Sequence, residues 1–190
     1  MEAARAVIAG GAQVIQWRDK TRDKGEQLPI IREIISICKK SGVVSIINDH
    51  LDLALIAGSD GIHLGQRDLP LTETRPLFPN GKIIGISTAT IEEAKKAEAN
   101  GADYDAVGSI YPTASKEVTR PAGLDTLQRV VKAVSIPVVA IGGINAQNIT
   151  PVVESGADAI CVISAVLSKT NIEFAAESLS SKIRTTKNIR

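Results

Sequence analysis

Two patterns of hydrophobic and polar positions alternate along this chain. Short runs rich in Val and Ile are separated by longer stretches in which apolar residues recur every three to four positions. The first pattern is typical of buried strands and the second of amphipathic helices. The predicted strands are AQVIQWR, VVSIIND, GIHLG, KIIGIST, YDAVGSI, IPVVAIGG and AICVIS. The predicted helices cover 2–9, 26–41, 51–57, 71–77, 90–99, 124–134, 146–155 and 171–183.

This regular succession of strands and helices indicates the fold class. Strands that alternate with helices form βα units and a parallel sheet, and strands that are apolar on both faces indicate a sheet covered on both sides. A short segment with Gly at a helix end, just before a strand, recurs as AGGAQVI, AGSDGIHL, NGADYDAV and SGADAICV. The repetition favours an α/β fold of the TIM (β/α)8-type barrel class, with one domain over residues 1–190. An open α/β sheet is the alternative.

The number of strands conflicts with a complete barrel. The pattern predicts seven strands, and the chain opens on a helix. A (β/α)8 barrel needs eight strands to close. We therefore expect the barrel to lack its first β-strand at the N-terminus, which makes the chain about 20 to 25 residues shorter than a full barrel of this type.

Composition and charge exclude several classes of function. The 190 residues carry a formal net charge of +1, so the overall charge does not favour nucleic acid or an anionic membrane as a partner. Aromatic residues make up only 3% of the chain, which argues against platforms that stack bases. No apolar run reaches the roughly 20 residues of a membrane-spanning helix. We expect small-molecule partners, and a homo-oligomer stays open.

The two cysteines bear on the compartment. Cys38 and Cys161 lie in apolar patterns, without a CxxC spacing or a histidine partner. Free buried thiols are typical of reducing compartments. The sequence therefore predicts a cytoplasmic protein.

Polar residues collect where the predicted strands end, and in barrels this edge carries the chemistry. In VIQWRDK, alternation places Gln16, Arg18 and Lys20 on one face of a strand. Cations and hydroxyls from other strand ends would converge with them. That set comprises Arg18, Lys20, Lys116, Ser87, Thr113 and Ser115. Such a set suits phosphoryl oxygens, although Arg18 and Lys20 taken alone also fit solvated charges at a strand end.

Two carboxylates follow neighbouring strands and suggest a metal site. Asp49 comes directly after one strand, and Asp68 comes a few residues after the next. Carboxylate oxygens are the ligands that Mg²⁺ prefers, and a bound diphosphate with waters would complete the coordination. The alternative is that each aspartate caps a helix, with Pro70 marking the start of the second.

Two glycine and serine motifs near the last strands predict a second anion site. AIGGIN (140–145) would let backbone amides approach a ligand, and VISAV (162–166) follows one strand later. In barrels the loops after the last two strands frequently bind phosphate, although a glycine pair after a strand is also a common turn. Of the two histidines, His63 is expected to be a hydrogen-bonded interior residue, and His50 is expected to orient Asp49 or to be solvated.

Together these motifs resemble the thiamine-phosphate synthase (thiamine-phosphate pyrophosphorylase) family. The resemblance lies in QWRDK, INDH…GIHLGQRDLP, GIST, GADYDAVGSIYPTASK, AIGGI and VISAV, in order and over nearly the whole chain. It implies a TIM barrel that joins hydroxymethylpyrimidine diphosphate to thiazole phosphate, giving thiamine phosphate and diphosphate. It also implies a dissociative, Mg²⁺-assisted mechanism in which diphosphate leaves first and the thiazole nitrogen captures the pyrimidine cation.

The resemblance also implies roles for individual residues. The diphosphate would be bound by Arg18, Lys20, Asn48, Ser87 and Lys116, of which Arg18, Lys20, Ser87 and Lys116 would act in catalysis. Gln16 would bind the pyrimidine side. Asp49 and Asp68 would ligate Mg²⁺. The thiazole phosphate would be held by Thr113, Ser115, Gly143, Ile163 and Ser164.

Four departures from the family pattern leave alternatives open. The first strand is absent, and the loop PTASKEVTRPAGLD is shorter than many family loops at this place. Ser115 stands where Thr is common, and Ser109 stands where Pro is common. A sibling, the thiazole tautomerase, shares the barrel but uses a histidine at the place of Ser109, and this chain keeps both metal carboxylates. A non-catalytic, degenerate barrel that binds phosphate ligands is the second alternative, and it is favoured only by the missing strand.

Overall fold

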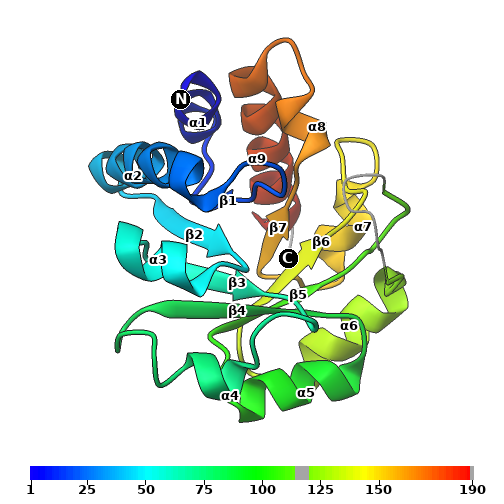
Figure 1. Ribbon diagram of the computed structural model, residues 1–190. Coiled ribbons are helices and arrows are strands. Elements are labelled where there is room, and N and C mark those ends of the chain that lie inside the picture. Colours follow the sequence, from blue (N-terminus) through cyan, green and yellow to red (C-terminus); the bar gives the residue numbers. More distant parts are fainter. Residues whose placement is uncertain (114–119, 189–190) are drawn as a thin grey trace.

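Seven parallel strands form a curved sheet with helices on its outer side (Figure 1). The structure, a computed structural model, describes residues 1–113 and 120–188. The strands are β1 (Val14–Trp17), β2 (Val44–Asn48), β3 (Gly61–Leu64), β4 (Ile83–Thr88), β5 (Tyr104–Val107), β6 (Val138–Ile141) and β7 (Ala159–Cys161). Each strand pairs with its sequence neighbours, in the order β1 to β7. The predicted α/β class and its seven strands are therefore confirmed.

The helices follow the predicted pattern with local differences. They are α1 (Glu2–Ala9), α2 (Lys24–Ser41), α3 (Leu51–Ala57), α4 (Leu71–Thr74), α5 (Ile91–Ala99), α6 (Gly123–Ala133), α7 (Ile149–Glu154), α8 (Ser164–Leu167) and α9 (Ile172–Asn188). The short helix α8 was not predicted. Helix α7 begins three residues later than predicted, because Asn145 and Asn148 close a turn in which the Asn145 amide donates to Asn148 Oδ1 at 2.8 Å.

The repeated glycine segments have one conformation in common. Gly11, Gly58, Gly101 and Gly156 all have φ angles between 72° and 95°. This left-handed region is open to glycine and strained for most other residues, and it turns the chain from a helix end toward the next strand. The repeat seen in the sequence is thus the structural joint between successive βα units.

The core consists mainly of the layer between the sheet and the helices. One buried cluster joins β5, β6 and the helices that follow them, and includes Val107, Leu127 and Val138. A second cluster joins β2 to β4 with α2 and α3, and includes Ile31, Ile62 and Ile84. Of the two cysteines, Cys38 is buried, as expected, whereas Cys161 on β7 is only half-buried.

The two ends of the sheet are not paired with each other within residues 1–113 and 120–188, so β1 and β7 are its edges. The helix layer nevertheless continues across this opening, because α1 packs against α9 (Figure 1). Among the described residues, the helices are each too short or too polar to cross a bilayer.

Candidate functional site

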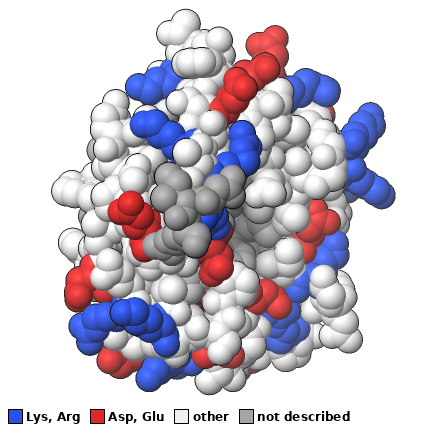
Figure 2. Space-filling view, turned by 180° about the vertical axis from the view of Figure 1, so that it is seen from behind, with Lys and Arg blue, Asp and Glu red and all other residues white. Residues whose placement is uncertain are grey.

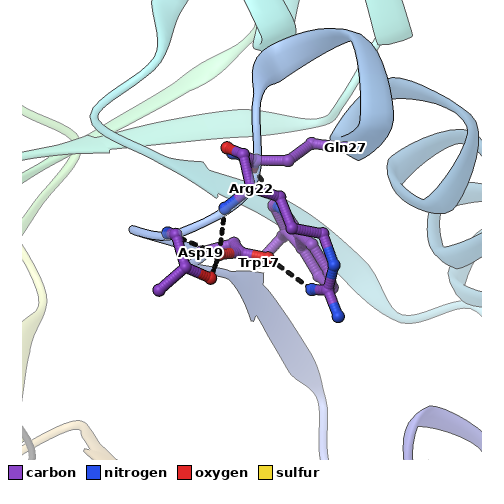
Figure 3. Close-up of polar contacts among 5 residues, drawn as sticks. Trp17, Asp19, Arg22 and Gln27 are labelled. Carbon is purple, nitrogen blue, oxygen red and sulfur yellow. Dashed lines mark hydrogen bonds and ion pairs between the residues drawn. The ribbon is translucent and has the colours of Figure 1, made fainter.

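At the end of β1 the side chain of Trp17 points toward the helices, on the face opposite to the one predicted for Gln16. The Trp17 indole Nε1 donates to Gln27 Oε1 of α2 at 2.9 Å, and the Gln27 amide donates to the Arg22 carbonyl at 2.8 Å (Figure 3). Gln16 is a neighbour of Trp17 in β1, so its side chain lies on the opposite face of the strand. Arg18 and Lys20 follow just beyond the strand.

Asp19 fixes the turn between β1 and α2. Its Oδ1 accepts from the Thr21 amide at 2.8 Å and from the Arg22 amide at 3.2 Å, and Oδ2 is paired with the Arg22 guanidinium (Figure 3). The Thr21 backbone bond, followed by those from the Thr21 hydroxyl and Arg22, lowers the pKa of Asp19. A charged, tightly bonded Asp19 holds the segment that carries Arg18 and Lys20.

The two aspartates predicted as metal ligands lie together. The Lys20 ammonium pairs with Asp49, and Asp49 in turn lies within hydrogen-bonding reach of Asp68. Asp49 has a φ of 63°, a left-handed conformation that Asp tolerates better than most residues, and its amide donates to the His63 carbonyl at 2.8 Å. We call Asp49 and Asp68 the carboxylate pair.

Neither aspartate caps a helix, the alternative that the sequence left open. The residues before α3 and α4 are His50 and Pro70, and neither side chain makes a capping bond. Asp68 instead accepts the Gly65 amide at 2.7 Å and closes the turn after β3.

The carboxylate pair has the electrostatics of a cation site. Burial, followed by the hydrogen bond with Asp49, raises the pKa of Asp68. Burial opposes the ionisation of Asp49 too, but the bonds with Lys20 and Asp68 hold its pKa below the ordinary value. Where the two carboxylates approach each other, Asp68 therefore holds a proton more readily than Asp49 does. Because a divalent cation would relieve the same repulsion with two hard oxygen ligands, the pair fits Mg²⁺.

The protein would supply only part of such a coordination shell. Within the described residues, no group of three or more His, Cys, Asp and Glu side chains gathers in one place. Mg²⁺ commonly keeps one or two carboxylates and takes its remaining oxygens from phosphate and water. The carboxylate pair matches this arrangement.

The carboxylate pair opens into a surface hollow of about 510 Å³. The hollow is lined by Lys20, Lys24, Asp49, His50, Leu51, Asp52, Leu55, Asp68 and Leu69. At its rim the Lys24 ammonium pairs with Asp52 at 2.7 Å. This first hollow therefore offers a cation and two acidic ligands side by side.

A second hollow, of about 560 Å³, lies at the ends of β6 and β7. It is lined by Pro112, Thr113, Gly143, Ile144, Asn145, Ser164, Ala165 and Lys169. Gly143 has a φ of 66°, and a Cβ there would lie 2.5 Å from the Pro112 carbonyl oxygen, so only glycine fits. Thr113, Gly143 and Ser164 thus line one hollow, and Ile163 immediately precedes Ser164 at the start of α8.

Other predicted residues stand outside both hollows. Gln16, Arg18, Asn48 and Ser87 lie at or just beyond the ends of β1, β2 and β4, but they do not line either hollow. Ser115 and Lys116 fall in 114–119, outside the described residues. The carboxyl edge of the sheet nevertheless carries every described residue of the predicted set.

Sequence reasoning missed several residues at this edge. Lys24 and Lys169 line the two hollows, but each belongs to a helical or loop pattern that resembles an ordinary solvated surface. Tyr104 was also missed, because it opens a strand and its place beneath the strand ends depends on packing. Gln66, just beyond β3, donates its side-chain amide to the Ser87 carbonyl at 2.8 Å.

The charges on the face shown in Figure 2 are mixed: basic and acidic side chains alternate around it, and neither sign forms a continuous field. This agrees with the formal net charge of +1. An anionic ligand would therefore have to be bound by local groups of side chains, such as Lys20 and its neighbours in the first hollow.

A parallel α/β sheet with cations, carboxylates and a glycine turn at the carboxyl ends of its strands is the arrangement of barrel-type enzymes that act on small phosphorylated substrates. Comparison with known proteins defines the family. A family profile described as thiamine monophosphate synthase matches residues 1–166. This chain belongs to the thiamine monophosphate synthase family.

Individual relatives cover almost the whole chain. A thiamine-phosphate synthase from Methanocella arvoryzae is 50% identical over 183 residues, which are 96% of this chain and 86% of the relative. Another, from Coprothermobacter proteolyticus, is 47% identical over 178 residues, covering 94% of this chain and 84% of the relative. Among solved structures, a thiamine phosphate pyrophosphorylase from Pyrococcus furiosus superposes with a TM-score of 0.92 at 37% identity, covering 97% of this chain and 89% of that one.

Proposed function

We propose that this chain is a thiamine-phosphate synthase that condenses hydroxymethylpyrimidine diphosphate with thiazole phosphate and releases diphosphate. The observation that supports the proposal is that two separate hollows open at one edge of the sheet, and we assign one phosphorylated substrate to each. The first hollow holds Lys20 and the carboxylate pair, and the second holds Thr113, Gly143 and Ser164. Two phosphorylated substrates require two such sites.

In the proposed mechanism Lys20 of the first hollow acts on the leaving group together with other residues that follow the strand ends. Arg18, Lys20, Ser87 and Lys116 would bind diphosphate oxygens as negative charge builds on them, together with Asn48. Interactions that strengthen as the bond breaks lower the barrier of the chemical step. Gln16 would orient the pyrimidine, whose amino group stabilises the cation left behind. No protein nucleophile is needed.

The carboxylate pair would hold Mg²⁺ against the diphosphate. Bound there, the metal would neutralise charge on the leaving diphosphate. Asp49 and Asp68 are supported in this role by their mutual contact and by the turn through which each is positioned. Lys20 would then be released from Asp49 to face the phosphate.

The second hollow would bind the thiazole phosphate. Backbone amides around Gly143 and Ser164, with the hydroxyls of Thr113 and Ser115, are suited to a phosphate dianion. Ile163 would contribute through its backbone. Once diphosphate has left, the thiazole nitrogen held here would attack the pyrimidine cation.

The test is a reaction of purified protein with both substrates and Mg²⁺, followed by detection of thiamine phosphate. We expect product, and we expect it to be lost without Mg²⁺ or in the Asp49→Ala/Asp68→Ala double variant. Asp52→Asn is the matched control, because Asp52 lines the same hollow but is paired with Lys24 at the rim. Ligand binding without product would favour the degenerate barrel, and product formed without metal would overturn the role of the carboxylate pair.

We also propose that the seven strands belong to one (β/α)8 barrel domain whose first strand would lie between β1 and β7. Two features support this: among the described residues β1 and β7 each have a free edge, and α1 contacts α9 outside them, so the helix layer already spans the opening. The test is a chimera extended at the N-terminus by the first strand of the Methanocella relative. A higher melting temperature is expected, and an unchanged one would contradict the proposal.

A further inference from the structure

Three residues on neighbouring strands meet beneath the strand-end site. His63 on β3, Gly85 on β4 and Tyr104 on β5 are partners in the parallel register. A Cβ on Gly85 would lie only 1.9 Å from Tyr104 Cζ, so the glycine leaves the space that the tyrosine ring occupies. Tyr104 therefore reaches across β4, and its ring stacks on His63 with a centroid separation of 5.6 Å.

A chain of hydrogen bonds runs from this layer to a residue of the proposed site. The Tyr104 hydroxyl lies 2.9 Å from His63 Nδ1, and His63 Nε2 lies 2.8 Å from Ser87 Oγ. The His63 side chain is buried, at 4% exposure. Ser87 is two residues beyond Gly85 on the same face of β4. Its backbone carbonyl accepts a hydrogen bond from the Gln66 side-chain amide.

We propose that Tyr104 and His63 are positioning residues that turn the Ser87 hydroxyl into a hydrogen-bond donor toward the leaving diphosphate. The inference builds on the proposed function, since it takes Ser87 as a ligand of that diphosphate. It assigns a role to Tyr104 and His63, which do not line either hollow.

The order of protons follows from the chemistry of the three groups. In a neutral imidazole one nitrogen donates and the other accepts. Burial, with a smaller contribution from Cys161, raises the pKa of Tyr104, so the phenol stays protonated, and we assign its proton to the 2.9 Å bond with Nδ1. His63 then carries its proton on Nε2 and donates to Ser87 Oγ.

This order decides what Ser87 offers to a ligand. With its oxygen already accepting from His63, Ser87 is left with its own proton to donate, and phosphoryl oxygens accept hydrogen bonds. In the opposite order Ser87 would donate to His63 and present only lone pairs, which repel an anion. Tyr104, at one end of this series of hydrogen bonds, thus determines whether Ser87, at the other end, donates or accepts a hydrogen bond toward the ligand.

The first test reads the tautomer directly. The chain has only two histidines, so nitrogen NMR of histidine-labelled protein gives two ring systems, and His50→Gln assigns them. We expect the Nε2–H tautomer for His63, with the Nδ1–H form appearing in Tyr104→Phe. Nδ1–H, or a doubly protonated ring, in the unsubstituted protein would overturn the proposal. This test requires no catalysis, so it is independent of whether thiamine phosphate is formed.

The second test measures affinity for inorganic diphosphate with Mg²⁺. Tyr104→Phe is expected to weaken binding about three- to tenfold, the value of one well-oriented hydrogen bond. In the Ser87→Ala background the same substitution should have no further effect, because the hydroxyl it orients is gone. Equal weakening in both backgrounds would overturn the proposal. Tyr111→Phe is the matched control, since Tyr111 donates to the Asn148 carbonyl at 3.2 Å, and it should bind diphosphate normally.

Failure of the proposed function has a different signature. Suppose that the protein forms no thiamine phosphate, that His63 is the Nε2–H tautomer, and that Tyr104→Phe weakens diphosphate binding only when Ser87 is present. The positioning role is then supported and the proposed synthase activity is refuted. If product forms and Tyr104→Phe leaves the affinity for diphosphate unchanged, the synthase activity is supported and the positioning role is refuted.

Discussion

Asp105 lies on β5 with a fully buried side chain, and neither of its carboxylate oxygens has a hydrogen-bond partner within the described part of the chain. Burial, with smaller contributions from Glu98 and Glu93 of α5, raises the pKa of Asp105 to about 7. In the unfolded chain the group ionises near its ordinary value of about 4. Between about pH 4 and pH 7, Asp105 is therefore protonated in the folded protein and ionised in the unfolded chain.

This difference predicts a loss of stability as pH rises. The stabilising contribution of Asp105 to the free energy of unfolding is fully present below about pH 4. It declines as the pH rises toward neutral and is lost above the folded pKa of about 7. Between pH 5.5 and pH 8 we expect the free energy of unfolding to fall by roughly 2 kcal/mol through this group. Urea denaturation at the two pH values measures it.

Substitutions separate Asp105 from other titrating groups. Asp105→Asn should remove most of this pH dependence, and Asp105→Val should stabilise the protein at pH 8 by roughly 1–3 kcal/mol, because an uncompensated buried charge is lost. Asp125→Asn is the control, since the Asp125 side chain is 84% exposed. An Asp105→Asn variant with the same pH dependence as the unsubstituted protein would contradict the assignment.

Gln27 is a second residue whose burial depends on its partners. Its side chain, 2% exposed, accepts from Trp17 and donates to the Arg22 carbonyl, so it joins β1, the following turn and α2. Gln27→Leu would leave both partners without these bonds, and we expect a loss of about 1–3 kcal/mol in stability. Because Trp17 is the only tryptophan, its fluorescence should also shift.

The control for this prediction is Gln128→Leu on the exposed side of α6, which should change stability by less than about 0.5 kcal/mol. Equal stability of Gln27→Leu and the unsubstituted protein would show that the Gln27 bonds have no net effect on folding.

At the scale of elements, the contact of α1 with α9 depends on one glycine. A Cβ on Gly10 would lie 2.5 Å from both Ala176 Cβ and the Glu173 carbonyl oxygen of α9. The Ser180 hydroxyl also donates to the Gly10 carbonyl at 3.0 Å. The two helices therefore approach as closely as their backbones allow.

Gly10→Ala should push α1 away from α9 and destabilise the protein by about 1–3 kcal/mol, as other overpacking substitutions do. The matched control is Gly25→Ala in the first turn of α2, where an added Cβ meets nothing within 4 Å. That variant should be neutral or more stable by up to about 1 kcal/mol. Chemical denaturation distinguishes the two, and an equal effect of both would contradict close packing at Gly10.

At the scale of the whole molecule, the open sheet predicts uneven protection of backbone amides. Strands β3, β4 and β5 have partners on both sides, whereas β1 and β7 have one partner each within the described residues. Hydrogen exchange should therefore be fastest in β1 and β7 and slower by at least about tenfold in β3 to β5. Equal protection across the sheet would show that the two edges are paired in solution.

The fold was predictable because it depends on periodicity. Apolar strands, amphipathic helices and the glycines that join them are local features, and each βα unit repeats them. The short helix α8 and the late start of α7 were not predictable in this way, because one turn of helix carries no periodicity and the Asn145–Asn148 turn replaces helical bonds with side-chain bonds.

For the site, the sequence by itself determined which residues stand at the strand ends, since a residue that follows a parallel strand must lie at the carboxyl edge. Only the tertiary structure decided which of them meet. The contact of Asp49 with Asp68, and the crossing of Tyr104 over Gly85 to His63, join residues from different strands. Such contacts depend on register and on the absence of a side chain at one position, and neither is visible in a pattern along a single strand.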